Sequence, residues 1–179
     1  MPESSAHLRA LAHPLRLRML SLLTGADLSA AEIARELGVT HANASYHLRF
    51  LLDAGELEVV GEERIRGGLA RRYRHPWRSE DRPARPEGAP AERAEAAAMF
   101  VEAAAEELRR RYARRRPGTG GLVADGELWV RPEVYAEARD LLERASALLH
   151  DAARPPRTEG TEPVSLSVFA FAMDSAAPT

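Results

Sequence analysis

The sequence predicts a mainly helical α+β fold in two parts, and three patterns carry this prediction. Leucines recur at largely helical spacing through the first 25 residues, with a break at Pro14 and a stop at Gly25. Two short runs of β-like composition surround Gly67 and Gly68, as in a hairpin. A proline-rich segment without an apolar pattern, residues 79–90, then marks a linker to a second helical part.

Local capping signals place two short helices between the leucine-rich opening and the hairpin. Ser29, followed three residues later by Glu32, has the spacing of a capping box. Gly38 is well placed to end that helix in a left-handed conformation. Thr40 is the next N-cap candidate, and the helix that it opens should be closed by Gly55.

A helical wheel separates two faces of the second helix, residues 41–54. Its apolar face can pack on the preceding helices and consists of Ala44, Leu48, Leu51 and Leu52. The opposite face carries Ala42, Asn43, Tyr46, Arg49 and Asp53, while His41 and Ser45 lie near the buried side in the accessible first turns. Helices joined by a short glycine-containing turn and followed by a hairpin have the order of a winged helix-turn-helix.

This order makes the polar face a candidate for the major groove of duplex DNA. Small residues at the helix tip allow close approach, and amide, hydroxyl and guanidinium groups can meet base edges and phosphates. Arg49 could contact a guanine or a phosphate, Asn43 suits adenine, and Tyr46 can contact the backbone or a thymine methyl group. Hairpin arginines would lie on the adjacent backbone or in the minor groove. The predicted DNA-contacting set is Thr40, His41, Ala42, Asn43, Ser45, Tyr46, His47, Arg49, Arg64, Arg66, Arg71 and Arg72.

Charge supports an anionic partner for one end of the molecule. Residues 64–78 hold six arginines and no acid, although the whole chain has a net charge of −2. An arginine-rich loop or a polar helix face can also be simply solvated. A further alternative is a winged helix that contacts an acidic protein through its arginines, with no direct readout of DNA.

Four stretches resemble the ArsR-type winged-helix transcriptional regulators: LRALAHPLRLRMLSLL, LSAAEIARELGV, ASYHLRFLLDAGELEV and RGGLARRYRH. The resemblance covers residues 5–78, and the C-terminal half is similar to the extension of actinobacterial members. It implies a cytoplasmic homodimer that binds an imperfect inverted repeat, usually as a repressor. The DNA-facing positions of the family fall on His41, Ala42, Ser45, Tyr46 and Arg49. His47 falls near the DNA backbone, or is alternatively a half-buried histidine that holds the helix to its neighbours.

The residue types argue against metal and enzyme chemistry. Cysteine is absent, and the six histidines include no pair at metal-ligand spacing on one helix face. The cysteine pair of metal-sensing relatives is replaced by the ordinary residues of EIARELG. No glycine-rich phosphate loop, nucleophile motif, signal peptide or membrane-length apolar run is visible. We therefore expect a non-enzymatic protein without a metal or cofactor and without membrane contact.

The predicted organisation is a winged helix-turn-helix domain at 1–78, the linker at 79–90, a C-terminal region at 91–174 and a tail at 175–179. Within the C-terminal region we predict a helix over 91–116, a strand over 122–130, a helix over 132–153 and a strand over 164–172.

An apolar set should give the C-terminal region a small core: Met99, Phe100, Val101, Leu108, Tyr112, Leu122, Leu128, Trp129, Val130, Tyr135, Leu141, Leu142, Leu148, Leu149, Val168, Phe169 and Phe171. Two roles remain open for this region. It is either only a dimerisation unit that sets the spacing of half-sites, or it also holds a pocket for a small apolar effector. Such a pocket would be lined by Trp129, Tyr135, Phe169 and Phe171.

Overall fold

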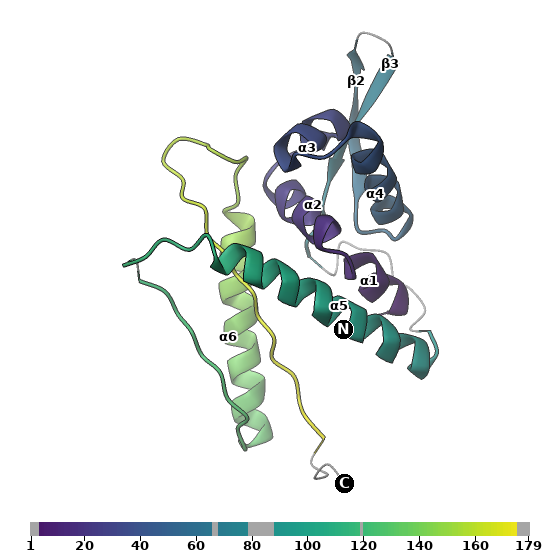
Figure 1. Cartoon of the computed structure of the whole chain (residues 1–179). Coiled ribbons are helices and arrows are strands. Elements are labelled where there is room, and N and C mark those ends of the chain that lie inside the picture. The colour runs from purple at the N-terminus through teal and green to yellow at the C-terminus, as the bar shows by residue number, and fades with distance from the viewer. Residues whose placement is uncertain (1–3, 66–67, 79–87, 119, 175–179) are drawn as a thin grey trace.

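The computed structural model describes residues 4–65, 68–78, 88–118 and 120–174 of the 179-residue chain. Its elements are the helices α1 (Ser5–Leu11), α2 (Pro14–Gly25), α3 (Ala30–Leu37), α4 (His41–Asp53), α5 (Pro90–Tyr112) and α6 (Pro132–Asp151) and the strands β1 (Leu28–Ser29), β2 (Glu58–Ile65) and β3 (Gly68–Arg74). Helices α2 to α4 gather around the base of the sheet, as Figure 1 shows. Helix α5 packs on α1 and α2, and α6 contacts α2 on the side away from the tip of the hairpin.

The short helices begin and end where the capping signals predict. Ser29 and Glu32 form a complete capping box at the start of α3, and Gly38 ends that helix with φ 67°. The Thr40 hydroxyl accepts a hydrogen bond of 3.2 Å from the N–H of Asn43 at the start of α4. Gly55 follows α4 with φ 67°, a left-handed conformation that costs glycine little. These predictions are confirmed.

The core lies between the N-terminal helices, and the predicted apolar face of α4 forms one wall of it. Ala44, Leu48 and Leu51 are completely buried, and Leu52 packs partly against them. The other core residues come mostly from α2 and α3: Ala10, Leu15, Met19, Leu20, Leu23, Ile33, Ala34 and Leu57. Close packing of these side chains holds α4 at a fixed angle to the rest of the domain.

The hairpin is confirmed and belongs to a three-stranded antiparallel sheet in the order β1-β3-β2. Its third strand, β1, was not predicted. Leu28 pairs with Tyr73 and Ser29 with Arg72, which joins the connection between α2 and α3 to the hairpin. A two-residue strand has no periodicity that a sequence pattern could show.

The C-terminal helices are confirmed with shorter ends, and the linker can be described only in part. Residues 79–87 of the predicted linker lie outside the described residues, and Pro90 already belongs to the first turn of α5. Helix α5 ends at Tyr112 and α6 at Asp151. Proline also occupies the first turn of α6, as predicted.

The prediction of two strands in the C-terminal region is wrong, and the predicted fold class is wrong in this detail. Residues 122–130 and 164–172 are extended but carry no strand, and no described residue after Arg74 pairs in a sheet. Strand composition creates a strand only where another edge completes the hydrogen-bond ladder. The structure is therefore a mainly helical α+β fold whose sheet lies wholly in the N-terminal part.

The predicted C-terminal core is also wrong. Trp129 is 86% exposed, Leu122 92% and Leu148 71%, and α6 has no buried residue. Helix α5 instead buries Ala96 and Ala103, and it packs on the N-terminal helices α1 and α2. Two helices that touch each other little cannot enclose a core within one chain.

No helix in the described part of the chain has both the length and the apolar character that crossing a membrane requires.

Candidate nucleic-acid interface

The outward face of α4 is exposed as the helical wheel predicts. Tyr46 is 59% exposed, and Arg49 and Asn43 are exposed beside it. Four further predicted contacts lie at the same end of the helix: Thr40, His41 and Ala42, which are exposed, and Ser45, which is half-buried. The first turn of α4 contains no acidic residue, so the positive end of the helix dipole is not neutralised. This tip can accept a phosphate while the exposed face meets base edges.

His47 is the exception among the predicted contacts on α4. It is 7% exposed, with its ring centroid 4.5 Å from that of His13 and 5.1 Å from that of Tyr46. Its Nδ1 is buried and has no hydrogen-bond partner among the described residues. Burial, followed by the charges of His13 and Arg16, lowers the pKa of His47 to about 4. The structure therefore has the buried histidine that was one of the two alternatives.

Arg16 supports α4 from behind, a role that sequence reasoning missed. Its guanidinium is buried and donates hydrogen bonds of 2.6 Å to the carbonyl oxygens of Ala10 and Arg9 at the end of α1. The same guanidinium lies 4.3 Å from the ring centroid of Phe50 on α4. An arginine within a leucine-rich helix gives no signal in the sequence that distinguishes it from an exposed one.

The hairpin arginines differ in their freedom to meet a ligand. Arg64 is exposed and has no ion pair among the described residues. Arg71 lies 3.6 Å from Glu62 across the hairpin, and both side chains are largely exposed. Arg66 lies outside the described residues.

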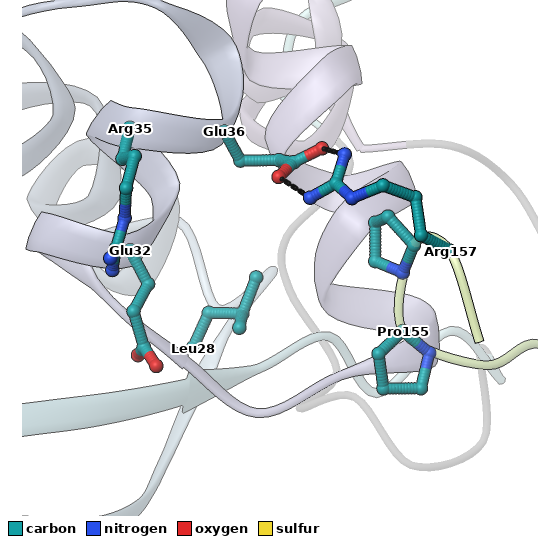
Figure 2. A pocket seen from close by; sticks show the side chains of 7 residues that line it. Leu28, Glu32, Arg35, Glu36, Pro155 and Arg157 are labelled. Atoms are coloured by element: carbon teal, nitrogen blue, oxygen red, sulfur yellow. Dashed lines mark hydrogen bonds and ion pairs between the residues drawn. The ribbon is translucent and has the colours of Figure 1, made fainter.

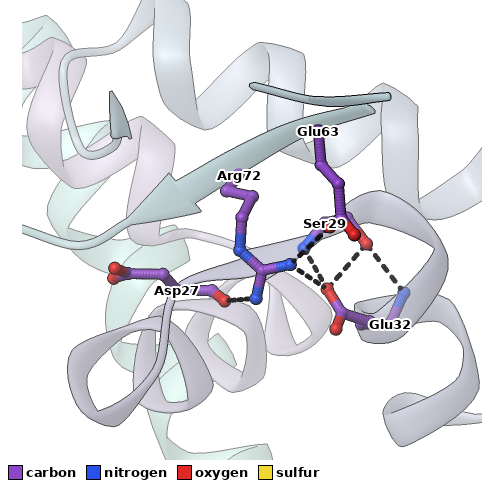
Figure 3. Close-up of polar contacts among 5 residues, drawn as sticks. All are labelled: Asp27, Ser29, Glu32, Glu63 and Arg72. Carbon is purple, nitrogen blue, oxygen red and sulfur yellow. Dashed lines mark hydrogen bonds and ion pairs between the residues drawn. The ribbon is translucent and has the colours of Figure 1, made fainter. Parts of the chain in front are cut away.

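Arg72 is held in a network at the base of the hairpin (Figure 3). It lies 3.3 Å from Glu32 and 3.2 Å from Glu63, and it also donates to the backbone carbonyl of Asp27. Burial alone would raise the pKa of Glu32, but hydrogen bonds from Ser29 and the charge of Arg72 hold that pKa below its usual value. Arg72 thus links the hairpin to α3, and a DNA contact by it would have to compete with these bonds.

Residues 64–78 contain arginines and no acid, so this stretch gave no indication that its arginines have acidic partners elsewhere in the chain. Register pairs Glu58 with Arg74 and Glu62 with Arg71, so acids of β2 lie opposite arginines of β3. The Asp27 carboxylate also binds Arg74 through two hydrogen bonds of 2.7 and 2.6 Å and raises the pKa of that guanidinium. The basic character of the hairpin is therefore partly neutralised within the fold.

A loop after α6 returns to α3 and contacts it (Figure 2). Arg157 donates two hydrogen bonds of 2.9 and 2.5 Å to the carboxylate of Glu36. A shallow pocket beside this ion pair is lined by side chains that include Leu28 and Pro155. The C-terminal part of the chain thus touches the helix that precedes α4.

Two of the four predicted effector residues line one groove, and the other two do not. Phe169 and Phe171 line an open groove with Phe100 of α5, and the ring centroids of Phe100 and Phe169 are 6.2 Å apart. Tyr135 is not among the residues that line this groove, and its hydroxyl donates to the carbonyl of Ala170 at 3.3 Å. Trp129 does not line the groove either and is 86% exposed.

Within the described residues, no group of three or more histidine, aspartate or glutamate side chains is placed to hold a metal ion. The donor sets available to a ligand at the α4 surface are instead hydroxyl, amide, imidazole and guanidinium groups, which suit nucleic acid.

Comparison with known proteins identifies the part of the chain to which this surface belongs. A family model described as a helix-turn-helix domain matches residues 11–60, the segment from the end of α1 into β2. A search among curated proteins found no match. No catalytic domain is identified. Residues 11–60 are therefore a helix-turn-helix domain of an ArsR-type winged-helix family, and the rest of the chain is unassigned.

Proposed function

We propose that the protein is a sequence-specific DNA-binding transcriptional regulator that acts as a homodimer on an inverted repeat. The observation that carries the proposal is the exposed polar face of α4, which follows a glycine turn within a matched helix-turn-helix domain. In such domains the second helix of the pair enters the major groove. Resemblance to ArsR-type regulators favours repression as the outcome of binding.

The side chains of α4 divide this task by their position. Arg49 and Asn43 can read base edges, and Tyr46 can contact a phosphate or a thymine methyl group. The positive end of the α4 dipole, which no acidic side chain of the first turn neutralises, favours a phosphate near His41. Arg64 is the described hairpin arginine best placed to reach the flanking backbone, because it is exposed and has no ion pair in the described part of the chain.

The test is retardation of duplex DNA from the region upstream of the gene, with wild type and Arg49→Ala. Removing one good bidentate contact costs about 1–3 kcal/mol, so the affinity should fall roughly 5- to 150-fold. Arg114→Ala is the matched control, because Arg114 is exposed just beyond α5 and away from α4. Circular dichroism should show that both variants are folded.

Two results would contradict the proposal. One is the absence of any retarded complex at low salt, where phosphate contacts are strongest. The other is an equal affinity for Arg49→Ala and wild type, which would leave a winged helix that binds an acidic protein as the better account of the arginines.

A further inference from the structure

Helix α6 carries an apolar stripe that no other described segment covers. Val134, Ala138, Leu141, Ala145 and Leu148 follow one another at intervals of four and three residues, which places them in one line along the helix. The exposed fraction is 42% for Val134, 50% for Leu141 and 71% for Leu148. These five residues are called the α6 stripe below.

The α6 stripe does not face the helix-turn-helix domain of its own chain. That contact is made by a different side of α6, where the ring of His150 stacks on Trp77 with centroids 4.9 Å apart. Ser146, one turn before His150, is half-buried on the same side. The stripe is therefore available while α6 stays docked.

The two edges of the α6 stripe differ in chemistry. One edge holds Glu137 and Arg144, and neither has an ion-pair partner in the described part of the chain. The other edge is apolar, with Leu142 38% exposed and Leu149 41% exposed. Whatever covers the stripe must supply apolar groups along its centre and opposite charges along one edge only.

We propose that the occupant is a second copy of the chain, whose α6 packs antiparallel against the first about a two-fold axis. A self-complementary patch is what two-fold symmetry requires. One register sets Ala138 opposite Leu141 of the partner subunit, so that a small residue meets a large one. The same register brings Glu137 next to Arg144 of the partner subunit, and symmetry repeats this ion pair at the other end.

Other arrangements of the same two helices fit poorly. Shifting the antiparallel pair by seven residues brings Arg144 against Arg144 of the partner subunit, which repels. A parallel pair places Glu137 beside Leu142 of the partner subunit and buries its charge against an apolar group. Charge thus selects both the direction and the register.

This inference deepens the proposed homodimer and rests on it, because it names the surface by which two helix-turn-helix domains are held together. Helix α6 packs on α2 rather than on α4, so pairing through the α6 stripe does not use the exposed face of α4. Reading of DNA and pairing through α6 are nevertheless separate properties that separate measurements can test.

The experiment is the dimer dissociation constant of the full chain by sedimentation, for four proteins. Wild type should be a dimer. Glu137→Arg sets like charges against each other at two symmetric places and should weaken the dimer at least tenfold. Adding Arg144→Glu to that variant should restore the affinity. Glu143→Arg is the matched control, because Glu143 lies on the side of α6 opposite the stripe, where it is 70% exposed and pairs with Arg139 of the same helix, and its reversal should leave the dimer unchanged.

A wild-type monomer throughout the concentration range would overturn the inference, as would equal weakening by Glu137→Arg and Glu143→Arg, or no restoration by the double variant. Retardation of DNA by Arg49→Ala and wild type separates the two proposals. A charge-sensitive dimer that binds no DNA would contradict only the proposed function. DNA binding by a dimer insensitive to Glu137 would contradict only the α6 pairing.

Discussion

The ring of His47 lies between α4 and the start of α2, packed at a tilt against the ring of His13 and shielded from solvent. A protonated imidazole here would lose hydration without gaining a partner, because Arg16 adds a second positive charge nearby. The neutral ring is therefore part of the packing that holds the outward face of α4 in place.

We expect stability to fall with acid because of this residue. The folded pKa of about 4 lies below the unfolded value of about 6.5, so the unfolded chain binds more protons between these two values. The free energy of unfolding therefore keeps the full contribution of the neutral His47 ring above about pH 6.5. It loses this contribution, on the order of 3 kcal/mol in all, as the pH falls toward 4. Urea unfolding at several pH values measures this.

His47→Gln is the control for that titration, since glutamine has no proton to gain. Its free energy of unfolding should change less steeply between pH 7 and pH 5 than that of wild type. Parallel pH profiles for the two proteins would show that other groups, such as His13, dominate the acid sensitivity.

At the scale of single elements, the caps and the face of α4 were predictable because each depends on residues a few positions apart. Ser29 with Glu32 and Gly38 fix α3 by local hydrogen bonds and a permitted left-handed φ angle. The partners of Arg72 were not predictable, because Glu32 lies forty residues away in sequence. Glu32 and Arg72 come together only when β1 and β3 pair, and a two-residue strand has no periodicity that a sequence pattern could show.

We therefore expect one hairpin arginine, Arg64, to contribute to DNA binding and another, Arg72, to contribute to the stability of the fold. Arg64→Ala should weaken DNA binding and reduce the slope of log affinity against log salt by about 1, because one phosphate contact is lost. Arg72→Ala should instead lower the free energy of unfolding, by about 1–3 kcal/mol, because Glu32 and Glu63 lose their partner.

The two measurements are salt-dependent retardation and thermal unfolding, made on both variants. Arg64→Ala should reduce the salt slope and leave the free energy of unfolding unchanged. Arg72→Ala should lower the free energy of unfolding and leave the salt slope unchanged. An unchanged stability together with a reduced slope for Arg72→Ala would mean that this side chain leaves its network to meet DNA.

At the scale of the whole molecule, sequence reasoning failed where the chain depends on contacts between distant parts. The strands predicted at 122–130 and 164–172 have suitable composition but find no edge to pair with. The C-terminal apolar residues have the composition of a core, yet α6 contributes no buried residue. Composition reports what a segment can bury, and only the arrangement of neighbours decides whether it does.

The docking of the C-terminal part on α2 depends on a glycine. A Cβ added at Gly25 would lie 2.8 Å from the carbonyl oxygen of Arg154, which is backbone and cannot rotate away. Gly25→Ala should push this segment off α2 and loosen the stack of His150 on Trp77. Trp77 fluorescence should shift to the red, measured with Trp129→Phe present so that only one tryptophan reports.

Gly120→Ala is the matched control, because a Cβ there meets nothing within 4 Å. It should leave the emission unchanged. An unshifted spectrum for Gly25→Ala as well would mean that the backbone at Arg154 yields without disturbing the stack.

Arg16 of α2 connects α1 to α4 through the contacts of one guanidinium group. Its guanidinium is anchored to the carbonyl oxygens at the end of α1, and α1 carries the packed length of α5. The same guanidinium also lies over the ring of Phe50 on α4. A displacement of α5 would therefore reach α4 through α1 and the planar guanidinium of Arg16, so the helix that we propose reads DNA would respond to whatever binds α5.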